Sequence, residues 1–149
     1  MDMMNVNIEL LPRGIMPTYA TDGSAGLDCY AQWDEQVWWG DVSEIDLGFK
    51  IEIPTGYVGL LCIRSGLAKR QLRLVNSVGV IDSDYRGEMK CLLTSDDPDY
   101  EWYSFDIGQG ERVCQLVIMP YPKVFLKQVE TLTTVTDRGE GGFGSTGTY

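Results

Sequence analysis

The sequence predicts an all-β fold: a single-domain, jelly-roll-like β-barrel or sandwich that carries a flexible, glycine-rich C-terminal arm. Three observations predict it. Short apolar segments bounded by Gly, Pro, Asp or Ser recur along the chain. No long window shows an apolar stripe with the 3.6-residue period of a helix. Residues 138–147 contain glycine at half of their positions and offer little to a core.

The clearest strand runs from Ile45 to Ile53, where every second residue is apolar and the residues between are polar or glycine. This period of two is typical of a half-buried strand, and Pro54 then ends it in a turn. A short helical turn is expected after Ser65. Further strands are expected at 6–11, 57–63, 72–75, 88–93, 113–119 and 124–129.

The length of 149 residues suits one domain with its own core. We therefore expect a β core over residues 1–137 and a flexible arm over 138–149. No apolar run is long enough to span a membrane, and the N-terminus lacks the pattern of a secretory signal, so we expect a soluble protein of the cytoplasm. The four cysteines stand singly, without a C-x-x-C pair, which favours buried, reduced thiols.

The formal net charge of −10 disfavours stable binding to nucleic acid, because phosphate contacts along a duplex rely on Lys and Arg. The chain contains no histidine, which excludes His-based acid–base chemistry and His-ligated zinc. Catalysis must therefore use carboxylates, hydroxyls, Lys, Arg, Tyr, Cys or a metal ion. A small nucleotide held by a metal ion and a few local donors remains compatible with this charge.

Two stretches, 34–46 and 94–106, each hold five acidic residues, with Trp38, Trp39 and Trp102 nearby. We interpret both as solvated loops with partly buried aromatic side chains. The alternative, a surface for an extra protein partner, stays open.

Five segments carry residue types suited to nucleotide chemistry. The arm combines glycines, Arg138, Phe143 and two hydroxyls, which fits phosphate oxygens and a stacked base. Two apolar residues lead directly into Asp82, and Tyr85 follows three residues later, so a carboxylate and a phenol stand close together. The other three segments supply an isolated acid, a Ser-Gly pair after an arginine, and Gln115 in an apolar strand. Each segment alone also fits a plain turn or a mobile tail.

In order, these segments resemble the five motifs of the trimeric dUTP pyrophosphatase (dUTPase) family: AGLD at 25–28, RSGLA at 64–68, GVIDSDYRGE at 79–88, GERVCQL at 110–116 and RGEGGFGSTG at 138–147. The resemblance implies a jelly-roll homotrimer with active sites at subunit interfaces. It also implies hydrolysis of dUTP to dUMP and pyrophosphate with Mg²⁺, which keeps uracil out of DNA and supplies dUMP.

The resemblance also implies roles for single residues. Asp82 is expected to activate the attacking water, Tyr85 to pack under the deoxyribose, and Asp28 to act on Mg²⁺ through water. The uracil edge is expected to meet Asn76 and backbone groups around Gly79, Val80, Ile81 and Lys90. Phosphate contacts are expected from Arg64, Ser65, Gly66 and Gln115, and from Arg138, Gly144, Ser145 and Thr146 of the arm, with Phe143 stacked on uracil.

Two alternatives stay open at this point. A dCTP deaminase shares the fold and parts of the motifs, although the intact arm motif favours triphosphate hydrolysis. A non-catalytic binding protein on the same scaffold would be expected to lose Asp82, Tyr85 or the arm motif, and all three are present.

Overall fold

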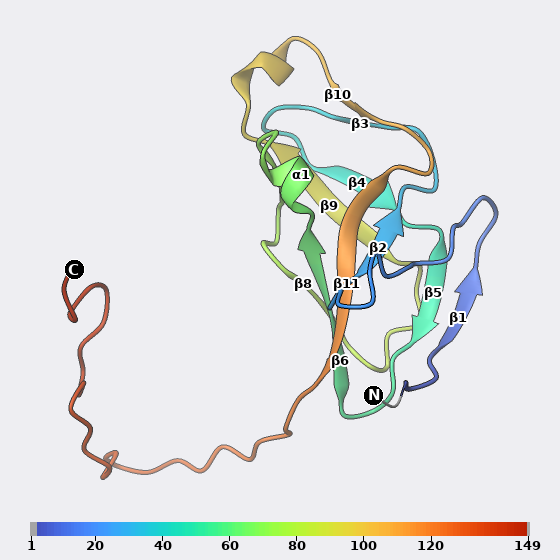
Figure 1. Ribbon diagram of the computed structural model, residues 1–149. Coiled ribbons are helices and arrows are strands. Elements are labelled where there is room, and N and C mark those ends of the chain that lie inside the picture. Colours follow the sequence, from blue (N-terminus) through green and yellow to red (C-terminus); the bar gives the residue numbers. More distant parts are fainter. Residues whose placement is uncertain (1–2, 149) are drawn as a thin grey trace.

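The computed structural model describes residues 3–148 and is almost entirely β-structure (Figure 1). Its only helical elements within that range are the single turn α1 (Ser65–Ala68) and the 3-10 turn η1 (Pro98–Glu101). The strands are β1 (Asn7–Leu10), β2 (Leu27–Tyr30), β3 (Glu35–Val37), β4 (Ser43–Asp46), β5 (Phe49–Glu52), β6 (Tyr57–Ile63), β7 (Leu72–Leu74), β8 (Gly79–Ile81), β9 (Lys90–Ser95), β10 (Phe105–Ile107) and β11 (Arg112–Pro120).

The strands form a sandwich, which confirms the predicted fold class. One sheet has the order β2-β11-β6-β8 and the other has the order β4-β9-β7. Two-stranded ribbons, β1-β5 and β10-β3, extend them. All the described pairs of neighbouring strands are antiparallel. The buried side chains of both sheets form one apolar cluster, so the core lies between the two layers.

The alternation predicted from Ile45 to Ile53 is confirmed, but the prediction that these residues form one strand is wrong. Its apolar residues are all buried, as the alternation predicts. The segment nevertheless divides into β4, which pairs with β9, and β5, which pairs with β1. The division falls at Gly48, whose φ of 77° is a left-handed conformation that favours glycine.

The expected strands at 6–11, 57–63, 72–75, 88–93 and 113–119 correspond to β1, β6, β7, β9 and β11, and the helical turn after Ser65 corresponds to α1. The expected strand at 124–129 is wrong. That segment runs as an extended chain without a paired neighbour, and Phe125 and Leu126 are 93% and 87% exposed.

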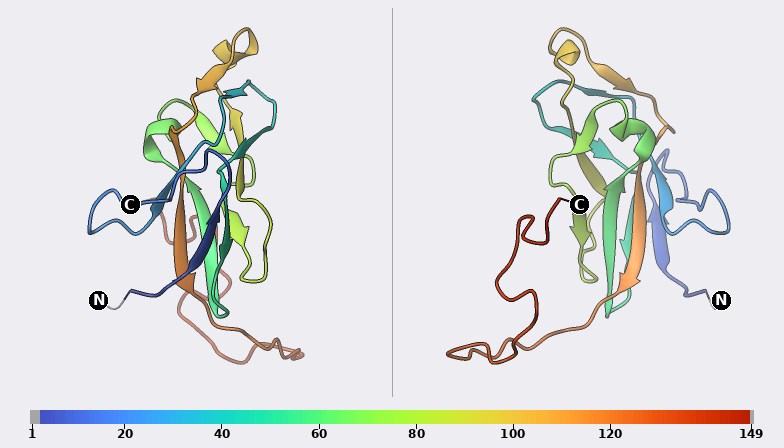
Figure 2. Two further views of the ribbon diagram at one scale, coloured as in Figure 1. Left: turned by 90° about the vertical axis from the view of Figure 1, so that its right-hand side faces the viewer. Right: turned by 60° about the vertical axis from the view of Figure 1, so that its left-hand side comes forward.

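After Pro120 the chain leaves the sheets and runs away from the body of the molecule (Figure 2). The backbone hydrogen bonds of residues 136–147 join neighbours within that segment; for example, the Gly147 N–H donates to the Gly144 carbonyl at 2.9 Å. The boundary expected between residues 137 and 138 stays a prediction, and position 149 of the expected arm lies outside the described residues.

The two acidic stretches are more ordered than loops. They contain β3, β10 and η1, and Asp97 caps η1 by accepting a hydrogen bond from the Asp99 N–H at 3.1 Å. Trp38 is half-buried as expected, whereas Trp39 and Trp102 are exposed. The Trp39 N–H donates to the Tyr100 carbonyl at 3.2 Å, so the two stretches lie side by side.

The cysteines are free, and Cys29, Cys91 and Cys114 are buried, as predicted, while Cys62 is half-buried. Contacts with the thiols of Cys29 and Cys91, together with burial, raise the pKa of Cys114. A raised pKa keeps this thiol protonated and unreactive, which fits a core residue. Separately, none of the helices described is long or apolar enough to cross a membrane.

Candidate functional site

Three of the five sequence segments meet at one end of the four-stranded sheet. Asp28 on β2 lies directly opposite Gln115 on β11. β11 also pairs with β6, whose last residue, Ile63, leads into Arg64 and then into α1 at Ser65. We name Asp28, Arg64, Ser65, Gly66 and Gln115 the phosphate cluster. The register of three strands therefore brings together residues that are far apart in the sequence.

Asp28 is nearly buried, and two arginines hold its carboxylate. The Arg64 Nε lies 3.1 Å from Oδ1, and the Arg112 Nε lies 3.6 Å from Oδ2. Arg112 lies within the motif at 110–116, but the sequence predicted no role for it. An arginine directly before the apolar strand expected at 113–119 was visible in the sequence. That pattern could not show that Arg112 pairs with Asp28.

Gln115 is fixed from two sides. Its Nε2 donates to the Ile63 carbonyl at 3.5 Å. A side chain at Gly26 would place its Cβ 2.6 Å from the Gln115 Oε1, so glycine is needed there for Gln115 to lie across the β2 strand entry. The half-buried amide of Gln115 therefore has a structural partner and keeps one oxygen for a further donor.

The predicted catalytic turn follows β8. Tyr85 N–H donates to the Asp82 carbonyl at 3.2 Å, and the Tyr85 hydroxyl donates to the Glu88 carbonyl at 2.9 Å. A Cβ at Gly87 would lie 2.3 Å from the Tyr85 hydroxyl oxygen, so the phenol packs over this glycine. The Asp82 side chain is exposed, and the hydroxyl of Tyr85 is held by its bond to Glu88 in the same turn.

The residues predicted to read uracil lie along β8 and the chain before it. A Cβ at Gly79 would lie 3.6 Å from the Asn76 Nδ2, which places this amide close to the backbone of β8. The Lys90 ammonium instead contacts Glu44 at 2.9 Å and Asp46 at 3.1 Å on β4. Hydrogen bonds to these two carboxylates raise the pKa of Lys90. The Lys90 side chain is thus committed to β4, and its backbone is what remains for a base.

Within one chain, the arm residues reach neither the phosphate cluster nor the turn that carries Asp82. Arg138 Nε donates to the Gly141 carbonyl at 2.8 Å within the arm. Phe143 is fully exposed, and Gly144, Ser145 and Thr146 are exposed as well. The positive φ values of Gly139, Gly144 and Gly147 give this segment its tight turns.

The strand register separates Asp82 from the phosphate cluster. Ile81 lies opposite Gly59 near the start of β6, whereas Arg64 follows the end of the same strand. About five residues of β6 therefore lie between these levels, which corresponds to roughly 17 Å at the rise of an extended strand. Asp82 and Arg64 of one chain stand at opposite ends of the sheet.

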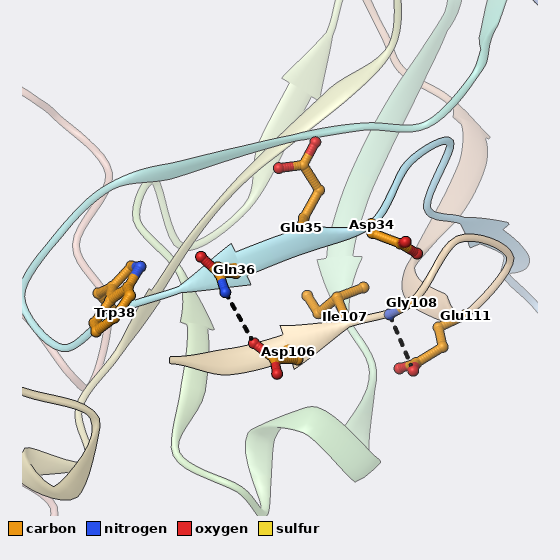
Figure 3. Close-up of a pocket in the computed structure, with 8 residues that line it drawn as sticks. All are labelled: Asp34, Glu35, Gln36, Trp38, Asp106, Ile107, Gly108 and Glu111. Carbon is orange, nitrogen blue, oxygen red and sulfur yellow. Dashed lines mark hydrogen bonds between the residues drawn. The ribbon is translucent and has the colours of Figure 1, made fainter. Parts of the chain in front are cut away.

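A shallow hollow of about 790 Å³ lies elsewhere, on the β3–β10 ribbon (Figure 3). Two of its carboxylates accept backbone hydrogen bonds: the Gln109 N–H donates to Asp34 at 2.8 Å, and the Gly108 N–H donates to Glu111 at 3.1 Å. Burial, followed by the charge of Asp46, raises the pKa of Glu35. The acidic side chains point in different directions in Figure 3, and no group of three metal-ligating side chains occurs among the described residues. The predicted site residues lie outside this hollow.

The protein is a β-sandwich in which a carboxylate held by two arginines stands beside Gln115 at one end of the larger sheet. Comparison with known proteins makes this specific. The sequence model of the dUTPase family matches residues 13–147, and the chain belongs to that family. The deoxyuridine 5′-triphosphate nucleotidohydrolase of Anaplasma marginale is 41% identical over 152 residues, which cover 98% of this chain and all of the relative. The enzyme of the same name from Alcanivorax borkumensis is 46% identical over 138 residues, or 89% and 87% of the two chains.

Solved structures agree with the family. A variant of the dUTPase of Staphylococcus bacteriophage 80alpha, solved with dUpNHpp, superposes with a TM-score of 0.90 at 30% identity, covering 98% of this chain and 100% of the other. The dUTPase of phage phi11 of S. aureus, described as coordinating a structural Mg(II) ion, has a TM-score of 0.76 at 24% identity, covering 86% and 98%. At that identity the likeness concerns the fold.

Proposed function

We propose that this protein hydrolyses dUTP to dUMP and pyrophosphate, which keeps uracil out of DNA and supplies dUMP. One observation carries the proposal. Asp28, Arg64 and Gln115 meet at one sheet end, within a chain whose relatives are dUTP nucleotidohydrolases along nearly its full length. The reaction is an in-line attack of water on the α-phosphorus, which depends mainly on positioning and charge neutralisation.

Asp82 takes the proton from the attacking water. Its exposed carboxylate stands at the end of β8, where a ligand can approach it. The bond from the Tyr85 hydroxyl to Glu88 keeps the ring in a fixed orientation beside this carboxylate. A ring fixed in this way packs under a deoxyribose and leaves no room for a 2′-hydroxyl.

Asn76 and the backbone of Gly79, Val80 and Ile81 recognise uracil. β8 is bound to β6 along its length, so its backbone is held rigidly. A rigid hairpin that is too tight for a 5-methyl group excludes thymine. The backbone of Lys90 contributes at the same edge.

Arg64, Ser65, Gly66 and Gln115 bind the phosphate chain. Asp28 would contact a Mg²⁺ ion carried by the nucleotide, because its carboxylate is already held by two arginines and is not free to serve as the centre of a protein-only metal site. The carboxylate of Asp28 keeps lone pairs for water molecules, so it fits a water-mediated contact and not direct ligation. When bound, Mg²⁺ takes up negative charge on the phosphates.

The active site is assembled from several copies of the chain, as in a homotrimer. Asp82 and Arg64 of one chain stand at opposite ends of β6, too far apart to act on one nucleotide. A second copy can bring its Asp82 turn beside the phosphate cluster of the first. The arm then closes over the nucleotide, with Phe143 stacked on uracil and with Arg138, Gly144, Ser145 and Thr146 on the phosphates.

We also propose that the two acidic stretches bind an additional protein partner. Trp102 is 82% exposed beside Asp99 and Glu101, and the hydrogen bond from Trp39 to Tyr100 joins the two stretches into one surface. Exposed aromatic side chains among carboxylates fit a basic partner with apolar contacts. A Trp102→Ser/Asp99→Asn variant should fail to retain, at low salt, a basic protein that the wild type retains. Equal retention by both would contradict the proposal.

Product analysis tests the catalytic proposal. Purified protein is incubated with Mg²⁺ and, separately, with dUTP, dCTP, dTTP and UTP, and the products are resolved by anion-exchange chromatography. We expect a monophosphate and pyrophosphate from dUTP alone. Loss of the amine from dCTP would identify a deaminase, and no reaction with any nucleotide would identify a binding protein on an enzyme's scaffold.

A further inference from the structure

We propose that Arg112 is a further substrate-binding residue: it forms with Arg64 an arginine pair, anchored by Asp28, that binds the phosphate chain. The inference rests on the proposed function, because it assigns a second cation to the same phosphate cluster. It starts from two ion pairs to one carboxylate, Arg64 Nε at 3.1 Å and Arg112 Nε at 3.6 Å.

A β-bulge places Arg112 on the face of the sheet that carries the phosphate cluster. Arg112 lies opposite Tyr30 and Cys114 lies opposite Cys29, so Val113 is an extra residue in β11. Val113 and Cys114 are consequently both buried, and Arg112 points outward on the same side as Gln115.

Strict alternation would have directed Arg112 into the core. Gln115 faces outward and Cys114 faces inward, so if residues 112–115 formed a regular strand without a bulge, Val113 would face outward and Arg112 inward. An unpaired guanidinium in an apolar core is prohibitively unfavourable. The bulge therefore turns the arginine toward the site, and bulges beside active sites commonly redirect a side chain in this way.

The charges of this group do not balance. Asp28 supplies one negative charge, and Arg64 alone would neutralise it. Arg112 adds a second positive charge, and among the described residues the ion pairs of both arginines are with Asp28. The group therefore carries one excess positive charge on a protein whose net charge is −10. Such a local cation fits an anionic ligand and disfavours direct ligation of a metal ion by Asp28.

The guanidinium of Arg112 keeps donors for that ligand. Its Nε faces Asp28, and its side chain is 50% exposed, compared with 33% for Arg64. A guanidinium carries five N–H donors, so the terminal nitrogens remain available to phosphate oxygens. Anchoring by Asp28 restricts the side chain beforehand, which lowers the entropy lost when the phosphate binds.

Arg112→Gln and Arg112→Lys test this role, and Arg73→Gln is the matched control. Arg73 is also half-exposed and also pairs through Nε with one aspartate, Asp96 at 2.8 Å, but it lies on β7 in the other sheet. Calorimetry measures the affinity of each protein for dUMP, dUDP and a non-hydrolysable dUTP analogue with Mg²⁺. Gel filtration and thermal melting accompany each measurement.

We expect Arg112→Gln to weaken binding of the triphosphate analogue by ~10- to 100-fold and binding of dUMP much less. Arg112→Lys should recover part of the affinity, because it keeps the charge without the planar fork. Arg73→Gln should match the wild type. An equal loss for all three ligands, an unchanged affinity for the analogue, or dissociation of the oligomer would overturn the proposal.

Inorganic tripolyphosphate separates this inference from the proposed function. If the wild type binds tripolyphosphate, Arg112→Gln binds it more weakly and dUTP is not hydrolysed, the arginine pair stands and the catalytic proposal fails. If dUTP is hydrolysed and Arg112→Gln binds tripolyphosphate as the wild type does, the arginine pair fails alone.

Discussion

At the scale of single residues, Asp82 and Tyr85 show how a short turn prepares a reactive group. Two hydrogen bonds stabilise the turn: the Tyr85 N–H donates to the Asp82 carbonyl at 3.2 Å, and the Tyr85 hydroxyl donates to the Glu88 carbonyl at 2.9 Å. The Arg86 guanidinium adds a bond to the Ser83 carbonyl at 2.7 Å. None of these hydrogen bonds within the turn uses the Asp82 carboxylate, which stays available for water.

We predict that Asp82→Asn lowers kcat by at least ~100-fold, because an amide cannot accept the proton from water. Binding of a non-hydrolysable dUTP analogue should change by less than about tenfold, since shape and hydrogen-bonding capacity are largely kept. Steady-state kinetics and calorimetry measure the two quantities. Asp84→Asn, in the same exposed turn, is the control and should retain most of the activity. An active Asp82→Asn protein would remove Asp82 from the role of base.

At the scale of elements, the passage from β4 to β5 shows how one strand pattern serves two sheets. The Leu11 N–H donates to the Gly48 carbonyl at 2.9 Å, and the Leu47 N–H donates to the Met89 carbonyl at 2.9 Å. The chain thus gains a second hydrogen-bonding partner at Gly48 while the same face stays buried: the Phe49 carbonyl still accepts from the Met89 N–H at 2.8 Å, and β5 pairs with β1. The close approach of Gly14 makes this crossing possible, because a Cβ on Gly48 would lie 2.7 Å from the Gly14 Cα.

We predict that Gly48→Ala destabilises the protein by about 2–4 kcal/mol, because it adds a backbone clash to a left-handed conformation. Gly56→Ala separates the two contributions. Gly56 also has a positive φ, 88°, but a Cβ there would meet nothing within 4 Å. This control should cost only about 1 kcal/mol. Urea unfolding measures both values, and equal costs would show that the contact with Gly14 is unimportant.

The sequence predicted the period of residues 45–53 but not its division, because burial follows local alternation whereas pairing depends on distant strands. β2, β3, β8 and β10 were missed for a related reason: strands of three or four residues are too short to show a period. η1 did carry a local signal, since Asp97 and Pro98 are a helix cap and a first-turn residue.

At the scale of the whole molecule, the motifs predicted which residues form the site, but no local pattern predicted how far apart the strands hold them within one chain. The phosphate cluster and the turn that carries Asp82 stand at opposite ends of β6, and the arm is apart from both. The incorrect prediction of a strand at 124–129 has the same cause. Its apolar pattern is that of a buried segment, yet one chain offers nothing to cover it, and Val124 is 73% exposed. An apolar run in the sequence does not say whether any strand of the same chain lies close enough to bury it.

We predict that two inactive variants, Asp82→Asn and Arg64→Gln, restore activity when they assemble together. Co-refolded subunits assort at random, and a site regains function when its Asp82 turn comes from the Arg64→Gln chain and its phosphate cluster from the Asp82→Asn chain. About one quarter of the sites satisfy both conditions, so a 1:1 mixture should show about one quarter of wild-type activity.

The control is the same two variants refolded separately and then mixed without exchange of subunits, which should stay inactive. Arg64→Gln is suited to this test because Asp28 keeps its second partner, Arg112, so the change leaves no unpaired buried carboxylate. If Asp82 and Arg64 of one chain served the same site, every mixed site would keep one defect. Co-refolding would then restore nothing, and the assembly of the site from different copies would be refuted.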